Sequence, residues 1–189
     1  MTLNLLLRSF GRVLWFAVAG AICMALVGAV AGSISGGLMI FIPNDFGYQG
    51  TNRLWKDVGT GAAFGAIYAV FTGLCSGAIA FGSAGTMACF SNLPKKVFRA
   101  SWRLAWRATL IGTFIGGVLG AINALLFGRF FGGRNDLFGG YLFGGYMIGV
   151  ISGFIVGTFY GALAGAEREV ARQKAEAKTV LPVVGSAVS

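Results

Sequence analysis

The sequence predicts an all-α integral membrane protein with four transmembrane helices, arranged as two tandem helical hairpins. Of the 189 residues, 56% are hydrophobic and only 11% are charged, whereas globular proteins carry charge on about a quarter of their residues. Four apolar stretches are long enough to cross a hydrocarbon core of about 30 Å, which takes about 20 helical residues. The second half of the chain repeats the pattern of the first. A soluble fold is excluded because so apolar a short chain could not cover its surface with polar groups.

The four stretches are expected to cross the membrane in alternating directions, which puts both ends of the chain on one side. The first covers 30 residues and would be about 45 Å long as a straight helix, so it must tilt, protrude or loosen near Gly36 and Gly37. It is too long for a signal peptide, whose apolar region has about 7 to 15 residues. The four predicted spans are 13–42, 58–81, 108–131 and 140–166.

The distribution of Lys and Arg predicts that both termini are cytoplasmic. Of the 15 basic residues, eleven flank the side that carries the termini and four flank the other side, and basic residues near membrane ends resist translocation. This asymmetry accounts for most of the net charge of +9, so no nucleic-acid partner is expected. No acidic residue lies within a predicted span, which argues against a proton relay or a cation site at mid-membrane.

The sequence indicates a tandem duplication. A shift of 91 positions aligns the first span with the third and pairs Asp45 with Asp136, while a shift of 80 aligns the second span with the fourth. We interpret residues 1–91 as the first two-helix repeat, 92–166 as the second and 167–189 as a charged cytoplasmic tail. Because each repeat returns the chain to its starting side, a pseudo-two-fold axis along the membrane normal is expected. The Asn-Asp pairs that end the first and third spans are interpreted as turn residues.

Small residues recur at every fourth position of all four spans, which predicts glycine-zipper packing. Residues four apart share a helix face, and in lipid a smooth face lets backbones approach closely. The first span has one such row from Ala17 to Gly37 and a second, partial row at Gly20, Gly28, Gly32 and Gly36. The rows either hold the monomer together or, alternatively, leave one face for a partner. The glycines expected to pack helices are Gly65, Gly73, Gly77, Gly112, Gly116, Gly120, Gly145, Gly149, Gly153, Gly157 and Gly161.

A basic and aromatic segment, residues 95–107, precedes the third span and is expected to form an interfacial amphipathic helix. Its basic residues recur every four positions beside an aromatic stripe. Such a helix can lay its apolar face in the headgroup region while the basic row meets anionic lipid. Docking of an acidic partner is the alternative. The residues expected at lipid headgroups are Lys95, Arg99, Trp102, Arg103, Trp106 and Arg107.

The composition leaves little room for reaction chemistry. There is no His, which is the commonest metal ligand and the usual proton shuttle near neutral pH. The three Cys are far apart in the sequence, so neither a disulfide framework nor a metal site is expected, and no cofactor is implied. Asn123 is the one carboxamide inside a span, and we expect it to form an interhelical hydrogen bond or, alternatively, to line a polar pathway.

The function that these features favour is that of a non-catalytic polytopic membrane protein. We expect a structural, assembly or accessory subunit that packs through its Gly and Ala faces and binds anionic lipid headgroups. Its protein partner would be another membrane protein or a second copy of the chain. The alternative is an oligomeric pore or small-solute transporter, motivated by the tandem repeat and by Asn123.

Overall fold

Four long helices make up the described part of the chain. The computed structural model describes residues 3–38, 51–131 and 138–186, and within them it contains helices and turns but no strand. The Asn-Asp pairs at 44–45 and 135–136 lie outside the described residues. The helices are α1 (Leu3–Leu38), α2 (Thr51–Ala88), α3 (Pro94–Phe131) and α4 (Phe138–Ser186).

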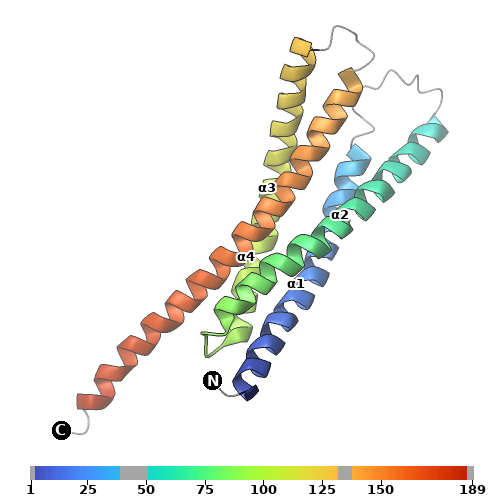
Figure 1. Cartoon of the computed structure of the whole chain (residues 1–189). Helices are drawn as coiled ribbons and strands as arrows, with labels where there is room; N and C mark the ends of the chain where they lie inside the picture. The colour runs from blue at the N-terminus through green and yellow to red at the C-terminus, as the bar shows by residue number, and fades with distance from the viewer. Residues whose placement is uncertain (1–2, 39–50, 132–137, 187–189) are drawn as a thin grey trace.

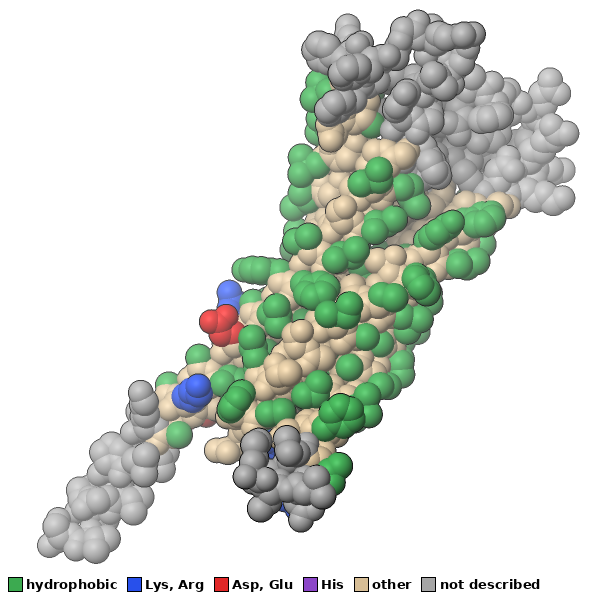
Figure 2. Space-filling view, viewed as in Figure 1, with side chains coloured by type: hydrophobic (Ala, Val, Ile, Leu, Met, Phe, Trp, Pro, Cys, Tyr) green, Lys and Arg blue, Asp and Glu red, His purple; other side chains and the backbone are tan. Residues whose placement is uncertain are grey.

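Each helix is long and apolar enough to cross a membrane, which confirms the prediction of four candidate spans. On the face shown in Figure 2, hydrophobic side chains cover the bundle and the charged side chains lie toward the end at which α1 begins. Helix α1 stays helical through Gly36 and Gly37 to Leu38, so the loosening considered there does not occur. The apolar segments are Leu7–Gly37, Val58–Ala88, Pro94–Leu126 and Gly144–Ala177.

The helices form two antiparallel pairs, α1 with α2 and α3 with α4. Figure 1 shows that α1 begins and α4 ends at the same end of the bundle, with α4 projecting beyond the other helices. We call the pair of α1 and α2 the first hairpin and the pair of α3 and α4 the second hairpin. The two hairpins meet mainly through α2 and α4.

Small side chains let the two hairpins approach each other. Ala80, Ala105 and Ala162 are fully buried around Phe81 and Met24 in one hydrophobic cluster. A second cluster near the chain ends contains Phe16, Ala84, Ala88, Val97 and Ala166. Alanine at these positions allows close helix contact in lipid, where packing rather than the hydrophobic effect drives association.

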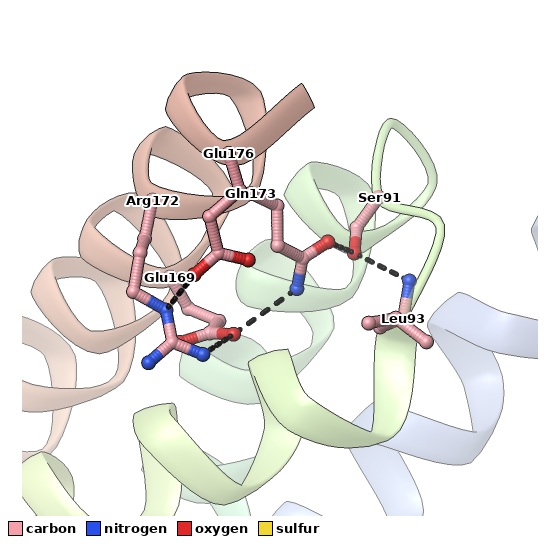
Figure 3. Close-up of polar contacts among 6 residues, drawn as sticks. All are labelled: Ser91, Leu93, Glu169, Arg172, Gln173 and Glu176. Atoms are coloured by element: carbon pink, nitrogen blue, oxygen red, sulfur yellow. Dashed lines mark hydrogen bonds and ion pairs between the residues drawn. The ribbon is translucent and has the colours of Figure 1, made fainter. Parts of the chain in front are cut away.

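The turn between α2 and α3 is fixed to the extension of α4. The Ser91 hydroxyl donates a hydrogen bond to Oε1 of Gln173 at 2.6 Å and accepts one from the backbone N–H of Leu93 at 3.0 Å. Gln173 in turn donates to Glu169 at 3.2 Å, and Arg172 pairs with the same carboxylate at 3.1 Å (Figure 3). The charged tail predicted from residue 167 onward therefore starts as a helix that is tied to the bundle.

Several Ser and Thr hydroxyl groups in the described parts of the helices bond to a carbonyl three or four residues earlier, but one pair connects two helices. Thr109 of α3 and Thr158 of α4 are fully buried, with their Oγ1 atoms 3.0 Å apart. Thr158 donates its proton to the Phe154 carbonyl at 2.8 Å, so its oxygen accepts the proton of Thr109. This bond joins the two helices of the second hairpin.

Replacing Thr109 by valine should lower the free energy of unfolding by about 1 kcal/mol, because interhelical hydrogen bonds in lipid contribute on the order of 0.6 to 2 kcal/mol. Unfolding by SDS in mixed micelles measures this difference. Thr72→Val is the control, since the Thr72 hydroxyl bonds only to the Tyr68 carbonyl of its own helix at 2.8 Å. Equal effects of the two substitutions would contradict a special role for the Thr109 bond.

Candidate functional site

The glycines of the second hairpin form a direct backbone contact between α3 and α4. A Cβ atom built on Gly149 would lie 2.8 Å from the Gly116 carbonyl carbon and 3.0 Å from the Gly120 Cα. A Cβ on Gly120 would in turn lie 3.0 Å from the Gly149 Cα. Real Cβ atoms essentially never come closer than 3.0 Å to such neighbours, so these positions exclude every side chain. The contact continues through Gly112 against Gly153.

The first hairpin makes the same kind of contact, and the row of α1 from Gly20 to Gly36 takes part in it. Gly32 meets the Gly65 backbone, Gly36 meets that of Gly61 and Gly28 meets that of Ala69. The row from Gly20 to Gly36 is therefore internal to the hairpin and is not left over. Residues of the other row of α1, including Ala21 and Ala25, lie beside the same contact with α2.

The remaining glycines singled out from the sequence also lie in interhelical contacts. Gly73 and Gly77 of α2 face α1 at Met24 and Gly20. Further along α4, Gly157 and Gly161 face α3 at Thr109 and Ala105, and Gly165 faces Ser101. The contact between α3 and α4 therefore extends down into the basic segment of α3.

The two hairpins have equivalent contacts at a register that differs from the one aligned by sequence. If the 80-position shift is kept for α2 and α4, the contact of Gly32 with Gly65 in the first hairpin corresponds to that of Gly120 with Gly145 in the second. Gly145 follows Gly65 by 80 positions, which is the shift that aligns the second span with the fourth. Gly120 follows Gly32 by 88 positions, whereas the sequence alignment of the first span with the third has a shift of 91. A difference of three residues is close to one helical turn of 3.6 residues, so a ladder of small residues aligns almost equally well in either register.

The groove beside the glycine contact of the first hairpin is filled by the second hairpin. Side chains of α4 cover the four small residues that α1 contributes to it, leaving about 20 Å³ of space. This groove is lined on α1 by Ala31, Gly32, Ser35 and Gly36, on α2 by Gly65, Tyr68, Ala69 and Thr72, and on the second hairpin by Thr113, Met147, Val150, Ile151 and Phe154.

The equivalent groove of the second hairpin is open. It has a volume of about 860 Å³ and runs along α3 and α4 on the side that carries Ile148 and Ser152. At the 88- and 80-position shifts, the eight groove residues of the first hairpin all fall on residues that line this groove. These are Leu119, Gly120, Asn123 and Ala124 on α3, and Gly145, Ile148, Gly149 and Ser152 on α4.

Asn123 lies exposed on the wall of this open groove. Its carboxamide has no hydrogen-bonded partner within the described part of the chain, so the interhelical bond expected of it is not formed there. Ser152 is likewise exposed in the groove, and Tyr160 stands at one end. The otherwise apolar groove therefore offers a few polar groups within helices that are long and apolar enough to cross a membrane.

The basic segment 95–107 is the start of α3 and not a separate helix. Helix α3 runs from Pro94 to Phe131 without a break, because Val97, Ser101 and Ala105 share one face that is buried completely against the bundle. The segment thus runs along the span instead of lying across it. Lys95, Arg99, Arg103, Trp106 and Arg107 are exposed, whereas Trp102 is half-buried against the hydrophobic core.

No group of His, Cys, Asp and Glu that could hold a metal ion occurs among the residues the structure describes. Cys23, Cys75 and Cys89 are free thiols. The open groove was not identified from the sequence, because every span carries a row of small residues and the rows do not show which one is covered by another helix. Its lining in the described residues is mostly glycine, alanine and aliphatic side chains.

Comparison with known protein families, with curated proteins and with solved structures gives no match.

Proposed function

We propose that the protein is a non-catalytic subunit of a membrane assembly, and that the open groove between α3 and α4 binds a transmembrane helix. The observation that supports this most directly is the contrast between the two equivalent grooves. One is filled by a helix of the same chain and retains about 20 Å³, and the other is open with about 860 Å³. A groove whose floor is glycine backbone suits a helix, because close backbone approach is the main source of helix association in lipid.

The polar groups in the groove favour a helix over lipid tails as its occupant. An acyl chain has no group that can bond to the Asn123 carboxamide or the Ser152 hydroxyl. Leaving a carboxamide without a partner in an apolar environment costs several kcal/mol. A docked helix can supply a side-chain or backbone acceptor, so these groups add specificity to a contact that is otherwise built on shape.

Filling the groove without touching its floor tests this proposal. Ser152→Trp places an indole in the groove, while Val118→Trp places one at an exposed α3 position that does not line it. We expect Ser152→Trp to remove the partner chain from the complex purified in mild detergent and Val118→Trp to leave it in place, as read by native mass spectrometry. Unchanged complexes in both variants would contradict the proposal.

Glycine substitutions are a poorer test of partner binding. Gly149→Leu and Gly153→Leu are the natural choices from the sequence, but both glycines contact the α3 backbone. Their replacement would break the hairpin itself, so loss of a partner would not show what the open groove binds. Ser152 avoids this problem because its side chain already lies in open space beside the contact.

We further propose that the chain is a tandem duplication of one hairpin with both termini in the cytoplasm. The equivalent contacts at Gly32 with Gly65 and at Gly120 with Gly145 support the duplication. The eleven basic residues that flank the end carrying the termini support the orientation. A pore through a single copy has less support, since the groove where the second hairpin packs on the first retains only about 20 Å³.

The exposed basic row of α3 is proposed to bind anionic lipid headgroups. From Lys95 to Arg107 the row extends about 18 Å along the helix, which exceeds a headgroup layer of roughly 5 to 8 Å. The guanidinium groups of Arg103 and Arg107 must then reach back toward the surface or draw phosphate groups inward. Either arrangement concentrates anionic lipid beside α3.

Replacing Arg99, Arg103 and Arg107 together by glutamine should lower the preference for anionic over zwitterionic lipid. Each basic residue near the surface contributes about 1 kcal/mol, so the triple variant should lose about 3 kcal/mol of that preference. Counting bound lipids by native mass spectrometry after reconstitution in mixed lipid measures the change. The same replacement at Arg168, Arg172 and Lys174 on the projecting part of α4 is the control, and an equal loss there would rule out a specific role for α3.

A further inference from the structure

The structure shows which side chains fill a groove of this kind. The groove of the first hairpin is covered by Met147, Val150, Ile151 and Phe154, which form an apolar ridge on α4. Phe154 is buried and belongs to the hydrophobic core between the hairpins. A groove lined by glycine and a ridge of large apolar side chains on a neighbouring helix thus form one complementary pair within the chain.

The first hairpin carries the corresponding ridge on α2, and three of its four residues are exposed. At the 80-position shift between α2 and α4, the ridge residues of α4 correspond to Ile67, Val70, Phe71 and Leu74. Ile67 is 66% exposed, Phe71 69% and Leu74 39%. Exposure alone is ordinary for a side chain that faces lipid. The informative feature is that one chain holds both a free ridge and the free groove that matches it.

We infer that the occupant of the open groove is a second copy of the chain, whose α2 ridge of Ile67, Phe71 and Leu74 packs into the groove between α3 and α4. This inference rests on the proposed function and names the partner. The orientation fits, because α4 runs parallel to α2 where it fills the first groove. An α2 from a copy inserted in the same direction would run parallel to α4 in the second.

The contact is heterologous, since a ridge on one copy meets a groove on the next. If a pseudo-two-fold axis related the two hairpins, the ridge of each would fill the groove of the other. Only the groove of the first hairpin is filled. The hairpins within the chain are therefore related head to tail. Heterologous contacts repeat until the rotation closes a ring, or continue as an open row. All copies share one membrane plane, so the protein should form assemblies larger than a dimer.

Oxidative cross-linking in the native membrane tests the inference. Within the chain, Ile151 of the ridge and Thr72 of the groove line the same filled space, and their counterparts between copies are Phe71 and Ser152. In a background with Cys23, Cys75 and Cys89 replaced by serine, Phe71→Cys and Ser152→Cys are introduced singly and together, and copper-phenanthroline is the oxidant. The double variant should give a ladder of cross-linked species above the dimer, and each single variant alone should give none.

Four outcomes distinguish this inference from the proposed function. A ladder from the double variant that disappears when Val118→Cys replaces Ser152→Cys supports a second copy in the groove. Absence of cross-links together with a different membrane protein lost on Ser152→Trp overturns the second copy while retaining a helix-binding groove. If no cross-links form, and the protein purifies as a monomer with or without Ser152→Trp, both the second copy and the helix-binding groove are overturned. A dimer from Phe71→Cys alone would indicate an isologous contact and would also overturn the inference.

Discussion

Replacing Gly149 by alanine is expected to separate α3 from α4 and to lower the free energy of unfolding by about 3 kcal/mol or more. One added methyl group would lie 2.8 Å from the Gly116 carbonyl carbon and 3.0 Å from the Gly120 Cα. Overpacking of an ordinary core costs about 1 to 3 kcal/mol because side chains can shift. Here the obstacle is backbone of another helix, which cannot rotate away, so the whole helix must move.

The chain offers a matched control five residues away. A Cβ atom built on Gly144 would meet no atom within 4 Å, and Gly144 belongs to the same helix. Gly144→Ala should be neutral or slightly stabilising, because alanine is about 1 kcal/mol better than glycine in a helix. SDS-induced unfolding in mixed micelles compares the two variants. If Gly149→Ala were as stable as Gly144→Ala, the backbone contact at Gly149 would not exist in the folded protein.

The four helices were predictable because length and apolar composition are properties of each segment taken alone. The boundaries shifted at the end that carries the termini, where α2 continues to Ala88 and α3 begins at Pro94. The predicted third span began after the basic segment 95–107, but these basic residues do not interrupt the helix. Arg99 and Arg103 continue α3 because the opposite face, at Val97, Ser101 and Ala105, is buried against the bundle.

The pairing of the helices was less accessible to sequence reasoning. Repeats of small residues give a face for contact, but they do not say which of two neighbouring rows is used or in which register. Gly32 against Gly65 and Gly120 against Gly145 are fixed only by the fit of whole helices. The open groove depends on the tertiary arrangement, since both hairpins have the same small residues and only one groove is covered.

The sequence predicted an interhelical hydrogen bond, but not the residues that form it. Asn123 was expected to form an interhelical hydrogen bond because it is the one carboxamide inside a predicted span. The structure places it on an exposed groove wall and forms the interhelical bond between Thr109 and Thr158 instead. Threonine usually bonds to its own helix, so its sequence context gave no sign that two of them would face each other across α3 and α4.

Replacing Phe98 by alanine is expected to loosen the two hairpins from each other while each hairpin stays paired. Phe98 of α3 lies among three aromatic rings of the first hairpin, with centroid distances of 4.9 Å to Trp15, 5.2 Å to Phe16 and 5.4 Å to Phe81. Two of these partners, Phe16 and Phe81, are almost completely buried. Truncating a packed Phe to Ala costs about 3 to 5 kcal/mol. Because Phe98 is only partly buried, we expect a value near the lower end of that range, about 3 kcal/mol.

The glycine contacts between α3 and α4 do not involve Phe98, so the second hairpin should survive the substitution. Cysteine pairs introduced within and between hairpins separate the two effects. Cross-linking between α3 and α4 should be retained, and cross-linking between α2 and α4 should fall. Phe114→Ala is the control, since Phe114 lies on the same helix and is 74% exposed. Equal destabilisation by the two substitutions, or an equal loss of both kinds of cross-link in Phe98→Ala, would show that the aromatic cluster does not hold the hairpins together.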